Sequence, residues 1–207
     1  MFQEQITRIK EKLEQLKSKD NKLRLFGTTQ HKYELNNVLS SEVIEEFEKS
    51  HKISLPSEYR HFLAEIGDGG AGPFYGVIKL EDSVYADMDF RAESELVNPS
   101  LPFPHTEAQW VYPEGVDEAE ELEEDEFNKI WKDPKHIQGI IRLCNFGCGV
   151  HIGLVVNGEE YGNMWSSDLS SEVGIYPSGQ LANEPERITF LDWYELWLDN
   201  SHKEFKK

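Results

Sequence analysis

The sequence has few cysteines, and their arrangement predicts neither a disulfide nor a metal site. Cys144 and Cys148 are the two cysteines among 207 residues, and they lie too close in the chain to close a loop that would stabilise the fold. His151 could act as a third ligand, but a structural zinc site takes four ligands and usually includes a Cys-x-x-Cys pair. We therefore expect free thiols that pack as small apolar groups, with no metal and no cofactor.

Long apolar runs are also lacking. Residues Met1 to Ile6 show no basic stretch followed by the unbroken apolar run of a secretion signal. No segment is long enough in apolar residues to span a bilayer. This pattern predicts a cytoplasmic protein with no membrane partner.

Basic residues are scarce, since 21 Lys and Arg stand against 39 Asp and Glu, for a net charge of −18. Nucleic-acid binding depends on Lys and Arg that displace counterions from phosphates, and anionic membranes attract basic segments in the same way. The charge balance therefore argues against both partners and favours a basic protein. The alternative is that the acidic surface serves solubility alone.

Catalytic motifs are missing as well. The chain has no Gly-x-Ser-x-Gly elbow, no His-Glu-x-x-His pair and no phosphate loop ending in Gly-Lys-Ser/Thr. The glycine-rich run from Gly67 to Pro73 follows an expected helix instead of leading into one, so it would present carbonyl groups and not the amides that bind phosphate. We expect a structural turn there, no catalytic residue and no enzymatic activity.

Apolar periodicity predicts several helices. One covers the first 16 residues and lies on the domain or forms a small dimer seam, so a monomer and a small homodimer both stay open. A second begins at Ser40 or Ser41 with Val43, Ile44 and Phe47 buried. A third has Pro56 at its first helical position and ends at Gly67 in a left-handed cap. A closing helix, capped by Thr189, buries the residues Phe190, Trp193, Tyr194, Trp197 and Leu198.

The strand signals lie mainly in the last third of the chain. They cover 137–143, 150–156, 161–165 and 173–176, with Asn157-Gly158 in a two-residue type I′ turn and Asn145-Phe146-Gly147 in another turn. A further apolar run, 74–80, reads as a strand after the glycine loop. The order indicates an α+β fold with a largely antiparallel sheet. We expect residues 1–30 to form a helix and connector, and 31–207 to form the main domain with an acidic insertion at 81–136.

That insertion carries half of the net charge in thirteen residues, 114–126, where nine residues are acidic and none is basic. The apolar residues Leu122, Phe127 and Ile130 indicate a helix with its acids facing solvent, starting at Asp117 and ending before Pro134. The candidates for partner binding are Glu114, Asp117, Glu118, Glu120, Glu121, Glu123, Glu124 and Asp125.

A family resemblance appears in the order of several short motifs. The first half contributes Leu55, Pro56, Tyr59, Phe62, Leu63, Gly67, Gly69, Gly70, Gly72, Pro73, Tyr75 and Gly76, and the second half contributes Cys144 to Gly149 (with Gly147), Leu154, Gly158, Tyr161, Gly162, Trp165 and the closing aromatic helix. From about Ser41 to Leu198 the chain resembles the SUKH superfamily, which includes fungal cell-wall-assembly regulators and many bacterial proteins.

The resemblance implies an α+β fold with helices around a mixed or antiparallel sheet and no catalysis. It also implies binding of a cognate toxin, often a nuclease or deaminase domain, inside the producing cell. An intracellular immunity protein is the first hypothesis. The alternative is a regulatory or scaffolding adaptor that binds an endogenous protein.

Overall fold

The computed structural model describes residues 2–86, 96–113, 116, 122–131, 133–136, 138–168, 174–179 and 187–205, without the side chains of 128, 131 and 134. Its elements are α1 (Gln3–Lys19), α2 (Thr28–His31), α3 (Ser41–His51), α4 (Ser57–Glu65), η1 (Leu80–Asp82), α5 (Glu124–Trp131), η3 (Pro134–His136), β1 (Ile140–Gly147), β2 (Val150–Val155), β3 (Met164–Asp168), β4 (Gly174–Pro177) and α6 (Phe190–Glu204). This arrangement confirms the α+β class.

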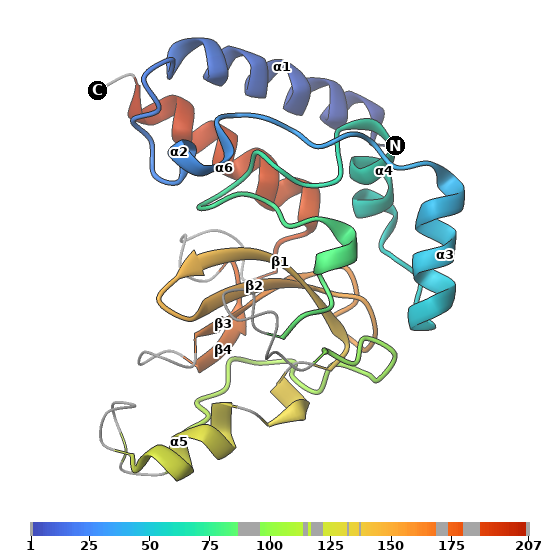
Figure 1. The fold of residues 1–207 in the computed structure, drawn as a ribbon, viewed down its shortest axis with the longest axis vertical. Helices are drawn as coiled ribbons and strands as arrows, with labels where there is room; N and C mark the ends of the chain where they lie inside the picture. Colours follow the sequence, from blue (N-terminus) through green and yellow to red (C-terminus); the bar gives the residue numbers. More distant parts are fainter. Residues whose placement is uncertain are drawn as a thin grey trace.

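The four strands form one antiparallel sheet in the order β1-β2-β3-β4. Its face toward the helices carries Ile141, Leu154 and Met164 in the main core, whereas Trp165 and Ile175 pack on the other face. Because both faces are covered, nearly every strand residue is buried. In Figure 1 the sheet lies between α6 on one side and α5 on the other.

The hairpin turns differ from the sequence prediction. The two-residue turn lies at Cys148-Gly149, between paired Gly147 and Val150, and both of its residues have positive φ (52° and 78°), as a type I′ turn requires. Asn157-Gly158 was the wrong position for such a turn, because β2 and β3 are joined by a longer loop. Gly158 instead pairs with Phe103, and a Cβ on Gly158 would lie 2.9 Å from Phe103 N.

Both edges of the sheet are covered by other segments. Along β1, Arg142 N donates to Ser83 O at 2.7 Å and Ile78 N donates to Leu143 O at 2.8 Å. Along β4, Gln109 and Ile175 exchange two backbone hydrogen bonds of 2.7 and 2.9 Å. These contacts occupy the backbone groups that an added strand would otherwise use.

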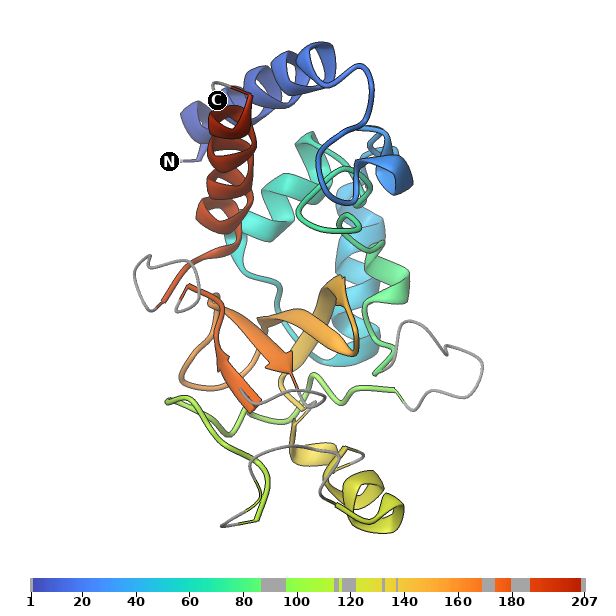
Figure 2. The ribbon, with the colours of Figure 1, turned by 90° about the vertical axis from the view of Figure 1, so that its left-hand side faces the viewer.

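Helices α1 and α6 lie side by side and run in the same direction (Figures 1 and 2). The predicted apolar stripe of α1 is confirmed, since Ile6, Ile9, Leu13 and Leu16 are buried. At the edge of the contact Glu195 pairs with Arg8 and Lys12, each at 2.9 Å, and these two cations hold the pKa of Glu195 down at about 2 against the effect of burial. The helix therefore packs on this chain's own core.

Two details of α3 and α4 depart from the sequence prediction. Ile44 is buried and Phe47 half-buried, but Val43 is 52% exposed, because it faces away from the core. Gly67 does not have a left-handed conformation; a Cβ there would lie 2.7 Å from Asn36 O, so close backbone packing explains the glycine. In addition, Pro56 is the N-cap residue of α4 and not its first helical residue, as the sequence predicted, because the helix begins at Ser57.

The closing helix is capped from another element. Thr189 is at the N-cap position, yet its side chain makes no capping hydrogen bond. The carboxylate of Glu58 on α4 instead accepts a 3.1 Å hydrogen bond from Leu191 N in the first turn of α6. This bond satisfies a free helix amide and places a negative charge at the positive end of the dipole.

The glycine loop is tied to its surroundings through backbone contacts. Gly70 has φ 103° and exchanges 2.8 Å hydrogen bonds with Val77, while a Cβ on it would lie 2.4 Å from Glu34 O. The Asp68 carboxylate accepts a 2.7 Å hydrogen bond from Leu80 N. The run 74–80 makes single bridges and enters η1, so the prediction of a regular strand there was wrong.

Candidate functional site

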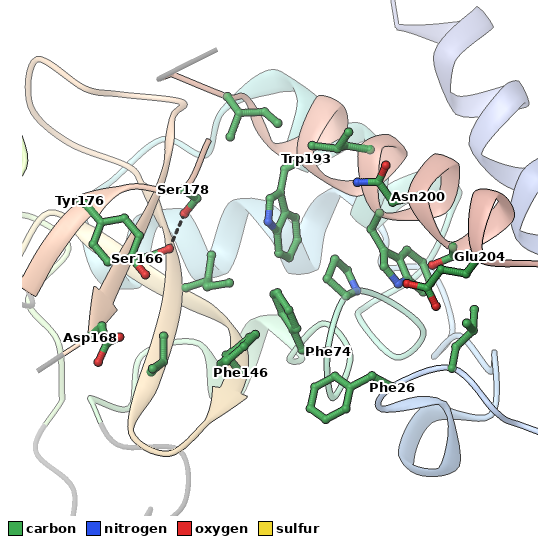
Figure 3. Close-up of a pocket in the computed structure, with 18 residues that line it drawn as sticks. Phe26, Phe74, Phe146, Ser166, Asp168, Tyr176, Ser178, Trp193, Asn200 and Glu204 are labelled. Carbon is green, nitrogen blue, oxygen red and sulfur yellow. Dashed lines mark hydrogen bonds between the residues drawn. The ribbon is translucent and has the colours of Figure 1, made fainter. Parts of the chain in front are cut away.

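A groove of about 510 Å³ lies between α6 and the sheet, and we call it the α6–sheet groove (Figure 3). Trp193 and Trp197 line it from α6, and Ser166, Asp168, Tyr176 and Ser178 line it from β3, β4 and the residue that follows. Its remaining wall comes from the connector around Phe26, from Phe74 after the glycine loop, and from Phe146 on β1. Volumes of this size are typical of binding sites.

An aromatic cluster forms the lip of the groove. Phe74 and Phe146 meet edge to face at 4.3 Å between ring centroids, and Phe26 lies 6.4 and 6.3 Å from these two rings. Tyr75 extends the cluster outward, 5.3 Å from Phe26. Phe26, Tyr75 and Phe146 are 59%, 43% and 42% exposed, so this is a contiguous apolar surface next to a concave site.

Local backbone geometry brings the lip together. Gly27 has φ 77°, and a Cβ there would lie 1.5 Å from Phe74 O, so only glycine permits the connector to approach this closely. The carboxylate of Asp20 accepts hydrogen bonds from Arg24 N (2.7 Å) and Leu25 N (3.2 Å), and these bonds fix the chain just before Phe26.

Two buried side chains bind the backbone of the loop just before Phe74. The Cys144 thiol lies 3.2 Å from Pro73 O, and the Tyr194 hydroxyl donates a 2.7 Å hydrogen bond to Ala71 O. Phe74 itself has φ 54°. The lip is therefore positioned by the packed core and by residues on α6 and β1.

Among the described residues that line the groove, the charged ones are acidic. Asp168 and Glu204 lie at opposite ends of the row of aromatic side chains in Figure 3. Burial, with help from nearby Asp168, raises the pKa of Tyr176 to about 12, so its hydroxyl stays protonated. Ser166 and Ser178 hydrogen-bond to each other at 2.8 Å. The described wall of the groove is therefore mainly apolar and aromatic, with a few polar groups among the aromatic rings.

The described residues do not assemble a recognisable catalytic or metal site. Cys144 is fully buried, and burial raises the pKa of its thiol, which disfavours a nucleophilic thiolate. Cys148 is exposed at the hairpin tip, so the expectation that both thiols are buried was wrong for Cys148. Across the described ranges, no three His, Cys, Asp or Glu side chains are grouped as metal ligands.

The motif residues of the sequence lie mainly in the architecture around the groove. Tyr59 is in the main core and Trp165 in the smaller core on the other sheet face. The motif residues that line the groove are Pro73, Phe146 and, on the closing helix, Trp193 and Trp197. Among the motif glycines, Gly67 and Gly72 are explained by close packing, and those with positive φ are Gly69, Gly70, Gly76, Gly147, Gly149, Gly158 and Gly162.

Five of the partner-binding candidates, namely Glu114, Asp117, Glu118, Glu120 and Glu121, lie outside the described residues. Glu123, Glu124 and Asp125 are exposed at the start of α5. The helix begins at Glu124, and the expected start at Asp117 also lies outside the described ranges. It ends at Trp131, as predicted before Pro134. Helix α5 lies at the opposite end of the molecule from α1 and α6, away from the groove.

Sequence reasoning missed the groove. The aromatic residues of the closing helix were interpreted as its buried face, and 20–30 was interpreted only as a connector. A signal was present, because Phe26 is a large apolar residue that falls outside the helical period and directly precedes a glycine.

Comparison with protein-family models gives one match, to the SMI1 / KNR4 family (SUKH-1), over residues 39–184. The chain belongs to the SMI1 / KNR4 family. Membership of the SMI1 / KNR4 family supports a toxin-immunity or related role, and such proteins are generally not enzymes. The match includes the glycine loop and the sheet and stops before α6. Neither the curated proteins nor the solved structures include a match.

Of the helices described, each is too short or too polar to cross a bilayer.

Proposed function

We propose that the chain is an intracellular immunity protein that binds a cognate toxin domain and neutralises it by protein–protein contact. The concentration of half the net charge in residues 114–126 carries this proposal, together with membership of the SMI1 / KNR4 family. A toxin that acts on nucleic acid has a basic active-site surface, and an acidic segment offers that surface carboxylates in place of phosphates.

The described part of this segment supports an electrostatic role. The four consecutive acids 123–126 are exposed, and three of them form the first turn of α5, where the helix dipole favours negative charge. The carboxylates of these four residues are therefore accessible to solvent and to a partner. Charge of this kind acts mainly on the association rate and on specificity.

Co-expression with the product of the adjacent upstream gene tests the function itself. Rescue of growth together with a stable purified complex is the expected result. A partner gene that is not toxic, with no complex formed, would contradict immunity and support the alternative of a regulatory or scaffolding adaptor that binds an endogenous protein.

The acidic segment is tested by neutralising Glu120, Glu121, Glu123 and Glu124 to Gln. We expect association with the basic partner at low salt to slow by about tenfold, and the difference to shrink at high salt because ions screen exposed charges. The control neutralises four exposed acids on other helices, namely Glu4, Glu11, Glu14 and Glu45. Equal association rates for the two quadruple variants would remove the acidic segment from the mechanism.

A further inference from the structure

A strip of exposed basic residues runs beside the aromatic lip, and we call it the basic strip. It consists of the five basic residues in 17–32, each of them exposed: Lys17, Lys19, Lys22, Arg24 and Lys32. The one acidic residue of this range is Asp20, which is 1% exposed and whose carboxylate accepts hydrogen bonds from Arg24 N, Leu25 N and the Tyr33 hydroxyl. This range therefore displays positive charge on a molecule whose net charge is −18.

The basic strip and the aromatic lip form one surface, because Phe26 follows Arg24 by two residues and belongs to the lip. Its ring lies 5.3 Å from that of Tyr75 and 6.3 Å from that of Phe146, and each of the three side chains is more than 40% exposed. Exposed aromatic rings beside cations complement a partner segment that is both apolar and acidic. The surface in question is the lip and the strip, outside the interior of the groove.

Helix α5 of the same chain has the complementary pattern. Phe127 and Ile130 lie three residues apart, so they share one face of the helix, and both are only half-buried. Glu123 and Glu126 precede them by four residues each, which places exposed carboxylates next to this apolar pair. Side chains at this helical spacing are about 5–6 Å apart, which is close to the spacing of the rings in the lip.

The two surfaces lie at opposite ends of the molecule (Figures 1 and 2). The chain that follows α5 is held at its own end, where Gly139 N donates a 2.9 Å hydrogen bond to Asn98 O. A contact between α5 and the lip therefore joins two molecules. We propose that α5 of one copy docks on the aromatic lip and the basic strip of a second copy, with Phe127 and Ile130 against the rings and the acids 123–126 toward the cations.

The net charge of −18 does not prevent this contact at physiological ionic strength. The Debye length is then about 8 Å, so the charges next to the contact decide its sign and more distant charges are screened. A nucleic acid would also find cations and aromatic rings here, but a long polyanion extends past the strip and meets the acidic remainder of the molecule. The second copy presents its acids and its apolar side chains together over two helical turns.

Sedimentation velocity of the purified full chain, at rising concentration and physiological ionic strength, tests the contact. We expect species larger than a monomer, and we expect two variants to weaken their formation at least tenfold. The strip variant is Lys22→Gln/Arg24→Gln/Phe26→Ala, and the α5 variant is Glu123→Gln/Glu124→Gln/Asp125→Asn/Glu126→Gln. Every substituted side chain is exposed, so the core stays intact.

Each variant has a control with the same kinds of substitution at exposed positions elsewhere. For the strip variant it is Lys10→Gln/Lys49→Gln/Leu101→Ala, and for the α5 variant it is Glu4→Gln/Glu11→Gln/Glu45→Gln/Glu46→Gln. Both controls should associate like the unchanged chain. A chain that stays monomeric at every concentration would overturn the proposal, and so would a strip variant that associates as well as its control.

An equimolar mixture of the strip variant and the α5 variant gives the sharpest result. The first still offers an intact α5 and the second an intact strip, so the mixture should associate although neither variant does so alone. A mixture that stays monomeric would show that the two surfaces do not meet. A monomeric chain that binds a single-stranded oligonucleotide, with binding lost in the strip variant, would replace the second copy by nucleic acid as the occupant.

Self-association through α5 goes beyond the proposed function and does not depend on it. Its consequence for a toxin does rest on that function: a basic toxin that binds the acidic segment competes with the second copy, so toxin binding should release it. A chain that neutralises a toxin and stays monomeric without it would leave immunity standing and refute this contact. A chain that associates as described but neutralises no toxin would do the reverse.

Discussion

Replacing Ile9 with Ala tests whether α1 is an integral part of the fold, although α1 lies outside the range that matches the family. Ile9 is fully buried in the main core. The substitution removes three carbon atoms, which amounts to about 2.4 kcal/mol of lost burial at about 0.8 kcal/mol per CH₂. Adding the unfilled cavity raises the expected destabilisation to about 3–4 kcal/mol, and so lowers the Tm by roughly 6–16 °C for a chain of this length.

Urea unfolding followed by circular dichroism and by Trp fluorescence measures this loss. We expect a lower midpoint with an unchanged slope, since a cooperative fold exposes the same surface in both proteins. The control is Glu11→Ala, an exposed position on the same helix, which should change the free energy of unfolding by less than about 0.5 kcal/mol. A loss below about 1 kcal/mol for Ile9→Ala, or an early separate transition, would show that α1 docks weakly and would refute the reasoning.

Two further predictions concern the buried histidines His31 and His136 and the cap that Glu58 provides for α6. Burial lowers the pKa of His31 and of His136 to about 4. In the unfolded chain the same imidazoles bind a proton near pH 6.5, so the free energy of unfolding should fall as the pH drops from about 6.5 to 4. At pH 5 the expected loss is about 1–2 kcal/mol per histidine. Urea titrations at pH 7.5 and 5.0 check this, and an unaltered pH dependence in His31→Gln would contradict it for that residue. Glu58→Ala removes the acceptor for Leu191 N and should cost about 1 kcal/mol, whereas Glu58→Gln keeps an acceptor and should cost less; equal losses would contradict a capping role.

The sequence predicted the elements whose signals are periodic and local. The stripe of α1, the N-terminus of α3 at Ser41 and the closing helix from Phe190 follow directly from apolar spacing and capping residues. The errors lie where long-range packing decides. Asn157-Gly158 has the residues of a type I′ turn, but Gly158 is paired with Phe103, a segment more than fifty residues away. The run 74–80 has strand-forming residues and is bent instead by its contacts with Gly70 and Cys144.

The groove could not have been predicted from spacing because its parts are distant in the chain. Phe26, Phe74, Phe146 and Trp193 come from four separate segments, and each has an ordinary local interpretation as core or connector. The acidic segment, in contrast, is visible from composition alone because its charges are consecutive. Sequence reasoning therefore favoured a site defined by charge over a site defined by tertiary contact.

The family match divides the groove in a way that bears on specificity. The sheet floor and Phe74 lie within 39–184, whereas Phe26 and all of α6, with Trp193, Trp197 and Glu204, lie outside it. Substitutions at the exposed positions of these outer segments change what the groove contacts without disturbing the glycine turns that hold the sheet, because those turns depend on backbone packing within the matched range. The pairing of α1 with α6 therefore supports the outer wall of the groove, because the two helices share the main core and the Arg8–Glu195 ion pair.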